Sequence, residues 1–83
     1  MTNEEIRKHF LTALTQVAPD IDASDVLGSD HIQDDLELDS MDVLNLVAAL
    51  HEKLGVDIPE VDYPRIATPD LATGYLAERL AAL

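Results

Sequence analysis

Apolar residues recur at helical spacing in three segments of this 83-residue chain, and residues that start or stop helices bound each segment. The first segment begins after Thr2 and ends before Pro19, the second runs from Asp39 to Leu54, and the third begins after Thr68. Residues 60–66 leave room for one short, irregular turn of helix. The pattern predicts an all-α fold, a small four-helix bundle of three main helices plus a short one.

The predicted helix ends have recognisable chemistry. Thr2 and Glu5 fit a capping box, Asp39 is a suitable N-cap, Gly55 is a suitable residue after a helix, and Pro69 suits a first helical position. The expected buried stripes are Ile6, Phe10, Ala13, Leu14 and Val17, then Val43, Leu46, Val47, Leu50 and Leu54, then Leu71, Tyr75, Leu76, Leu80 and Leu83.

A long acidic loop over residues 19–38 is predicted between the first two helices. Its apolar residues are expected to hold it against the bundle, namely Ile21, Val26, Leu27, Ile32, Leu36 and Leu38. A chain of this length has room for one small core, so we expect a single domain over residues 1–83.

Acidic residues outnumber basic ones by 17 to 5, for a formal net charge of −12, and no Lys or Arg occurs between Lys8 and Lys53. Such a charge opposes binding to phosphate backbones and acidic lipid surfaces, so we expect no nucleic-acid partner and no membrane insertion. Basic protein partners are expected instead. Without cysteine or a signal-like segment, the chain is expected to be cytoplasmic and free of disulfides. We also expect a monomer.

The predicted second helix has a second apolar strip besides its core stripe. Met41, Leu44 and Ala48 fall on this strip, among acidic residues. The long loop or the short helix would cover Leu44 if the strip were structural. An exposed strip rimmed by acids would instead dock on an apolar surface with a basic rim.

Ser40 lies between Asp39 and Asp42 at the start of this helix. Free backbone N–H groups and the helix dipole would stabilise a phosphate ester there, whereas the simpler interpretation is a capping serine. A catalytic serine is disfavoured, because no Gly-x-Ser-x-Gly motif is present and the histidines have no motif relation to Ser40. Those histidines are His9, His31 and His51.

The segment Asp-Asp-Leu-Glu-Leu-Asp-Ser-Met-Asp at residues 34–42 resembles the phosphopantetheine-attachment motif of acyl carrier proteins. The resemblance continues through Gly-Val-Asp-Ile-Pro at 55–59 and Thr-Pro-Asp-Leu-Ala at 68–72, and it covers essentially the whole chain. It implies a carrier that is not an enzyme and binds no metal. A separate phosphopantetheinyl transferase would attach 4′-phosphopantetheine from coenzyme A to Ser40, and its thiol would carry acyl groups as thioesters.

The resemblance also implies roles for other residues. The partner-binding face for transferase and for acyl-loading and acyl-transfer enzymes with basic docking surfaces would comprise Asp39, Met41, Asp42, Leu44, Ala48 and Glu52. The acyl-chain cavity would be lined by Phe10, Val43, Leu46, Leu50, Ile66, Leu71 and Tyr75.

Departures from the family pattern include Glu37 in place of the usual glycine, so we expect a different turn into the helix. Asn45 and His51 replace acids of the exposed face, and Pro64 is expected to affect how the cavity opens.

Several functions remain open at this point. The leading one is an acyl carrier in fatty acid, lipid or related biosynthesis. The alternatives are a polyketide, aminoacyl or peptidyl carrier, and an acidic helical interaction module without a prosthetic group.

Overall fold

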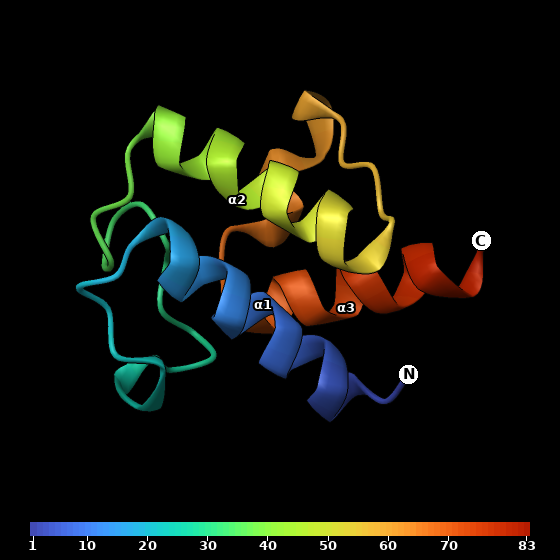
Figure 1. The fold of residues 1–83 in the computed structure, drawn as a ribbon, viewed down its shortest axis with the longest axis horizontal. Helices are drawn as coiled ribbons and strands as arrows, with labels where there is room; N and C mark the ends of the chain where they lie inside the picture. The colour runs from blue at the N-terminus through green and yellow to red at the C-terminus, as the bar shows by residue number, and fades with distance from the viewer.

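Helices and connecting loops make up the whole of the computed structural model, which describes residues 1–83 (Figure 1). The elements are α1 (Asn3–Val17), the 3₁₀ helix η1 (Ala23–Asp25), α2 (Ser40–Leu54), the 3₁₀ helix η2 (Glu60–Ile66) and α3 (Pro69–Ala81). The predicted all-α bundle of three main helices and a short one is confirmed. The single turn η1 inside the long loop was not predicted. Both termini lie at one end of the molecule, and α2 begins at the opposite end (Figure 1).

The predicted helix ends are confirmed by their hydrogen bonds. Glu5 N–H donates to Thr2 Oγ1 over 3.1 Å, and Thr2 N–H donates back to Glu5 Oε1 over 3.1 Å. Leu71 N–H donates to Thr68 Oγ1 over 3.1 Å. Gly55 has a φ of 70° and ends α2 in the left-handed conformation that glycine adopts at little cost.

One cluster of 17 buried apolar residues forms the core, to which all three α-helices contribute. Helix α1 packs against both α2 and α3. It contributes Ile6, Phe10, Ala13 and Leu14, whereas Val43, Leu46, Leu50 and Leu54 come from α2. The predicted stripes of these two helices are therefore confirmed, apart from Val17 and Val47, which are half-buried.

The predicted stripe of α3 is wrong at its ends. The helix buries Ala72, Tyr75 and Leu76, whereas the Leu71 side chain is 54% exposed and Leu83 is also exposed. Leu71 precedes Ala72 by one residue, which turns it ~100° around the helix from the buried face. Leu80 is half-buried.

Three buried side chains hold the long loop against the bundle, namely Val26, Ile32 and Leu38. Ile21 and Leu36 pack partly against the core, but the prediction for Leu27 is wrong, because its side chain is 64% exposed. A backbone hydrogen bond also holds the loop, since Ile32 N–H donates to Ala67 C=O over 2.9 Å. This bond joins the loop to the connection between η2 and α3.

Glu37 has a φ of 62° and is the only residue other than glycine with a positive φ. Whether this turn differs from that of the family stays a prediction. The backbone adopts the left-handed conformation that glycine would favour, with Glu37 in glycine's place. The turn is thereby able to bury Leu38 and to place Asp39 at the start of α2.

Replacing Glu37 by glycine should stabilise the protein. The change relieves the contact between Cβ and backbone in the left-handed region, and part of this gain is offset by the greater freedom of glycine in the unfolded chain. We expect a net gain of about 0.5–1 kcal/mol and a rise in Tm of about 3–6 °C. Thermal unfolding, monitored by circular dichroism, measures this rise in Tm. Glu37→Ala removes the same charge but keeps Cβ, so an equal rise in that control would contradict the role of φ.

Candidate functional site

Ser40 is the first residue of α2 and its side chain is exposed. The cap of the helix is Asp39, whose Oδ1 accepts a hydrogen bond from Asp42 N–H over 2.8 Å. Asp42 Oδ2 in turn accepts from Asp39 N–H over 3.3 Å. The capping-serine interpretation of Ser40 is therefore wrong. The Ser40 hydroxyl takes no part in these hydrogen bonds. The backbone N–H groups of Ser40 and Met41 lie in the first turn, where an α-helix has no acceptor for them.

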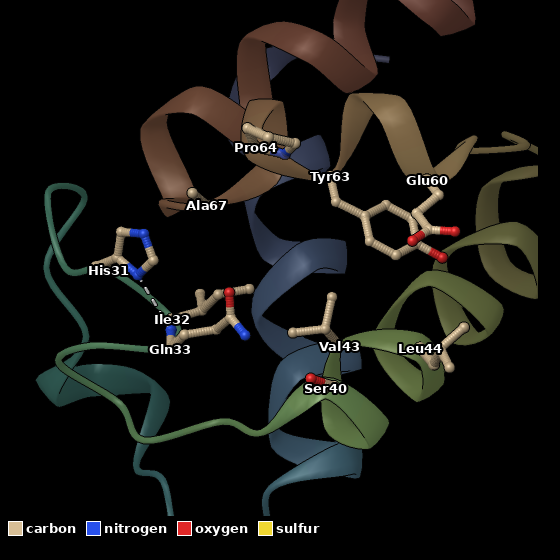
Figure 2. A pocket seen from close by; sticks show the side chains of 10 residues that line it. All are labelled: His31, Ile32, Gln33, Ser40, Val43, Leu44, Glu60, Tyr63, Pro64 and Ala67. Atoms are coloured by element: carbon tan, nitrogen blue, oxygen red, sulfur yellow. Dashed lines mark hydrogen bonds between the residues drawn. The ribbon is translucent and has the colours of Figure 1, made fainter.

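A pocket of about 550 Å³ opens beside Ser40 (Figure 2). One wall is the loop at 31–33, the second is the start of α2, and the third is η2 with the residue that follows it. The lining residues are His31, Ile32, Gln33, Ser40, Val43, Leu44, Glu60, Tyr63, Pro64 and Ala67. The hydrogen bond from Ile32 to Ala67 holds the first and third walls together.

His31 stands at one end of this pocket in a fixed orientation. Its Nδ1 accepts hydrogen bonds from the backbone N–H groups of Gln33 and Asp34, each over 3.2 Å. The Nδ1 atom also lies 3.8 Å from an Asp34 carboxylate oxygen. Because Nδ1 accepts two N–H groups, Nε2 is the ring nitrogen left free for other contacts.

Of the residues that line the pocket, the sequence prediction assigned Val43 to the acyl cavity, Ser40 to attachment and Leu44 to the partner-binding face. It missed His31, Gln33, Glu60 and Tyr63 because they come from segments far apart in the chain. No local pattern marks them. Pro64, which was expected to affect the opening of the cavity, does line the pocket.

Most residues of the predicted acyl cavity lie elsewhere. Phe10, Leu46, Leu50, Ile66 and Tyr75 are buried in the closed core, and only Val43 of the predicted set faces the pocket. The assignment of Leu71 is wrong, because its side chain is largely exposed on the outer side of α3. A role of the five core residues toward an acyl chain stays a prediction.

Contacts of the Tyr75 side chain hold η2 against α3. Its hydroxyl donates to Asp62 Oδ2 over 2.8 Å, and the Arg65 guanidinium lies 4.8 Å from the centre of its ring. Burial, followed by the bond to Asp62, raises the pKa of the Tyr75 hydroxyl, which therefore stays protonated as the donor. Arg65 also pairs with Glu78 of α3 over 2.9 Å. These contacts hold η2 in place as the third wall of the pocket.

Four of the predicted partner-binding residues, Met41, Leu44, Ala48 and Glu52, share one exposed side of α2, and Asp39 and Asp42 lie at its start. The side chain of Met41 is 63% exposed and that of Leu44 is 49% exposed. Asp39, Ala48 and Glu52 are also exposed, and Asp42 is half-buried because it takes part in the cap. We call these six residues the docking face. Val61 on η2 is another exposed apolar side chain, at 81%, that sequence reasoning did not single out.

The surroundings of Ser40 do not resemble a nucleophilic catalytic site. No hydrogen bond joins its hydroxyl to a histidine, and the His31 nitrogen that could accept its proton is occupied by backbone N–H groups. No group of three or more acidic, histidine or cysteine side chains is arranged to hold a metal ion. None of the helices has the length and apolar character needed to cross a membrane.

The structure is a small acidic helical bundle with an accessible serine at the start of α2, which is suited to carry an attached group. Comparisons with known proteins agree with this class. Residues 5–76 match the family model described as "Phosphopantetheine attachment site". The chain is 30% identical over 79 residues to "Acyl carrier protein" of Rubrobacter xylanophilus, which covers 92% of this chain and 98% of that protein. It is 32% identical over 84 residues to "Acyl carrier protein 2, mitochondrial" of Arabidopsis thaliana, covering 90% of this chain and 67% of that protein.

The chain therefore belongs to the phosphopantetheine-attachment family, among relatives that are acyl carrier proteins. Its prosthetic group is 4′-phosphopantetheine, and the protein is a carrier that does not itself catalyse a reaction. The predicted family, carrier function and cofactor are confirmed.

Proposed function

We propose that Ser40 is the attachment residue for 4′-phosphopantetheine and that the protein carries acyl groups as thioesters on this arm. The observation that carries the proposal is the free, exposed hydroxyl of Ser40 at the start of α2. The structure fits the group in two further ways. The first-turn N–H groups can receive a phosphodiester oxygen, and the adjacent pocket has room for part of a flexible chain.

The attachment reaction needs little from this chain besides the hydroxyl. Ser40 Oγ attacks a phosphorus atom of the coenzyme A pyrophosphate, a P–O anhydride bond breaks, and the nucleotide leaves with the electron pair. The hydroxyl proton passes to a base of the transferase, while one carboxylate oxygen each of Asp39 and Asp42 stays in the helix cap. Because the chain has no cysteine, the thiol is supplied by the arm once the arm is bound.

The test is to incubate the protein with coenzyme A, Mg²⁺ and a transferase of broad specificity, and to record its intact mass. One phosphopantetheine increment, located by fragmentation on the peptide that contains Ser40, supports the proposal. An unmodified mass, or an increment on another residue, would contradict it. A bare phosphate increment after isolation from cells would favour the alternative of an interaction module without a prosthetic group.

We further propose that the docking face receives the transferase and the enzymes that load and transfer acyl groups. Its apolar centre, Met41 and Leu44, is flanked by Asp39 and Glu52, and no Lys or Arg interrupts the stretch from Lys8 to Lys53. Partners with a basic rim around an apolar patch would match this distribution. We propose fatty acid or related lipid biosynthesis as the setting, with a cytoplasmic, monomeric single-domain protein.

Replacing Met41 by glutamate should weaken docking without unfolding the protein. The side chain already faces solvent, so the Tm should change by no more than about 2 °C. Loss of an apolar contact at the centre of an interface should lower the kcat/KM of the transferase about tenfold. Leu27→Glu is the matched control, since Leu27 is equally exposed but lies outside the docking face. An equal loss in that control would show that the effect comes from net charge alone.

A further inference from the structure

Two exposed leucines lie outside both the docking face and the pocket. The structure has seven large apolar side chains with high exposure, and five of them are at the chain ends, on the docking face or on η2, namely Met1, Leu83, Met41, Leu44 and Val61. The remaining two are Leu27 of the long loop, 64% exposed, and Leu71 in the first turn of α3, 54% exposed. Neither lines the pocket.

A close contact between two segments holds these leucines near each other. Asp70 N–H donates to Gly28 C=O over 3.0 Å, so the residue after Leu27 is bonded to the residue before Leu71. A Cβ atom at position 28 would overlap the Asp70 carboxylate, and this close approach therefore requires glycine. The same carboxylate accepts a hydrogen bond from Arg7 of α1 over 3.0 Å. Three segments thus fix the place where the two leucines are exposed.

The surroundings of the two leucines are acidic. Asp30 Oδ2 accepts a hydrogen bond from Leu27 N–H over 2.9 Å, which brings a carboxylate next to the first leucine. Asp70 immediately precedes the second leucine, Leu71. Arg7 is the basic side chain in these contacts, and it is paired with Asp70. We call Leu27, Leu71, Asp30 and Asp70 the loop–α3 face.

The charge of this face indicates what kind of partner fits it. A second copy of the chain carries the same net charge of −12, and an acidic lipid surface is also negative, so both would be repelled. A protein segment with apolar residues flanked by Lys or Arg would cover the leucines and pair with the carboxylates. Figure 1 shows the teal part of the long loop on the other side of α1 from α2, so such a segment would not cover the docking face.

We propose that the loop–α3 face binds a basic amphipathic segment of a partner protein, separately from the enzymes that act at Ser40. A partner bound there holds the carrier while the docking face receives the transferase or an acyl-transfer enzyme. Binding at this face needs no arm on Ser40, so the inference goes beyond the proposed function.

The test uses the full-length, isotope-labelled Met41→Glu protein and a synthetic amphipathic helix of leucine and lysine as the probe. The Met41→Glu change weakens binding of the probe to the docking face. A peptide of the same composition in scrambled order has the same charge but no apolar face. We expect the largest changes in backbone amide chemical shift at residues 25–30 and 69–73, and about tenfold weaker binding of the scrambled peptide.

Leu27→Gln and Leu71→Gln should each weaken binding of the helical peptide about three- to tenfold. Gly28→Ala should weaken it as well, because the added Cβ displaces the Asp70 carboxylate and disturbs the contact between the two segments. Leu83→Gln is the matched control, since Leu83 is an exposed leucine at the C-terminus, and should bind the peptide as before.

Three results would overturn the inference. They are equal affinity for the helical and the scrambled peptide, shift changes confined to the docking face, and full affinity in both Leu27→Gln and Leu71→Gln. None of them bears on attachment at Ser40, which the intact-mass experiment tests separately.

Discussion

The Ser40→Ala variant should gain no phosphopantetheine under conditions that modify the wild-type protein completely. The change removes the only atom of this residue that can form the phosphodiester. It should not disturb the fold, because Asp39 and not Ser40 caps α2, and Ser40 makes no hydrogen bond through its hydroxyl. Alanine also favours a helical position slightly more than serine, so the Tm should stay equal or rise. Intact mass and thermal unfolding, measured on the same samples, check both expectations.

Ser29→Ala is the control for this experiment. Ser29 is an exposed serine of the long loop, outside both the pocket and α2, so its variant should be modified at the wild-type rate. Modification of Ser40→Ala would assign the attachment to another residue. Loss of modification together with a large fall in Tm would show that Ser40 supports the fold, which the capping geometry does not predict.

Replacing Leu46 by aspartate should unfold the protein. Leu46 is fully buried between the helices, with no polar side chain buried in the core to pair with a carboxylate. Loss of the buried leucine and burial of an unpaired charge together should cost about 5–10 kcal/mol. A single domain of this size has only about 5–10 kcal/mol of total stability. We expect the loss of most helical circular dichroism at 37 °C and of the cooperative melting transition.

Asn45→Asp is the matched control for the core variant. It adds the same charge to the same helix one residue earlier, on an exposed side chain. Surface changes of this kind alter stability by about 0.5 kcal/mol or less, so the control should remain folded. A folded Leu46→Asp variant would mean that the closed core can open to admit water, in contrast to its complete burial here.

Local chemistry explains why the helix boundaries could be predicted from the sequence. Each start depends on side chains within three residues of each other, as between Thr2 and Glu5 or between Asp39 and Asp42. Gly55 marks the end of α2 by its own backbone preference. Such contacts join residues that are close in the sequence, so they can be recognised without a structure. The position of Ser40 at a helix start follows from them.

Tertiary contacts account for what could not be predicted. The buried face of α3 is fixed by its packing on α1 and by the contacts of Tyr75 with η2, and this orientation leaves Leu71 exposed. His31 lines the pocket because its loop is held to the bundle by contacts such as the hydrogen bond from Ile32 to Ala67, far away in the chain. The left-handed backbone of Glu37 is likewise imposed by its surroundings, against the preference of that residue type.

The arrangement of the termini has a practical consequence. Both chain ends lie opposite the start of α2, in a molecule whose longest dimension is 32 Å. An affinity tag, a surface linker or a fused neighbouring domain at either end would therefore sit away from Ser40 and its pocket. The carrier can be immobilised or joined to another protein through either terminus while Ser40 remains open to visiting enzymes.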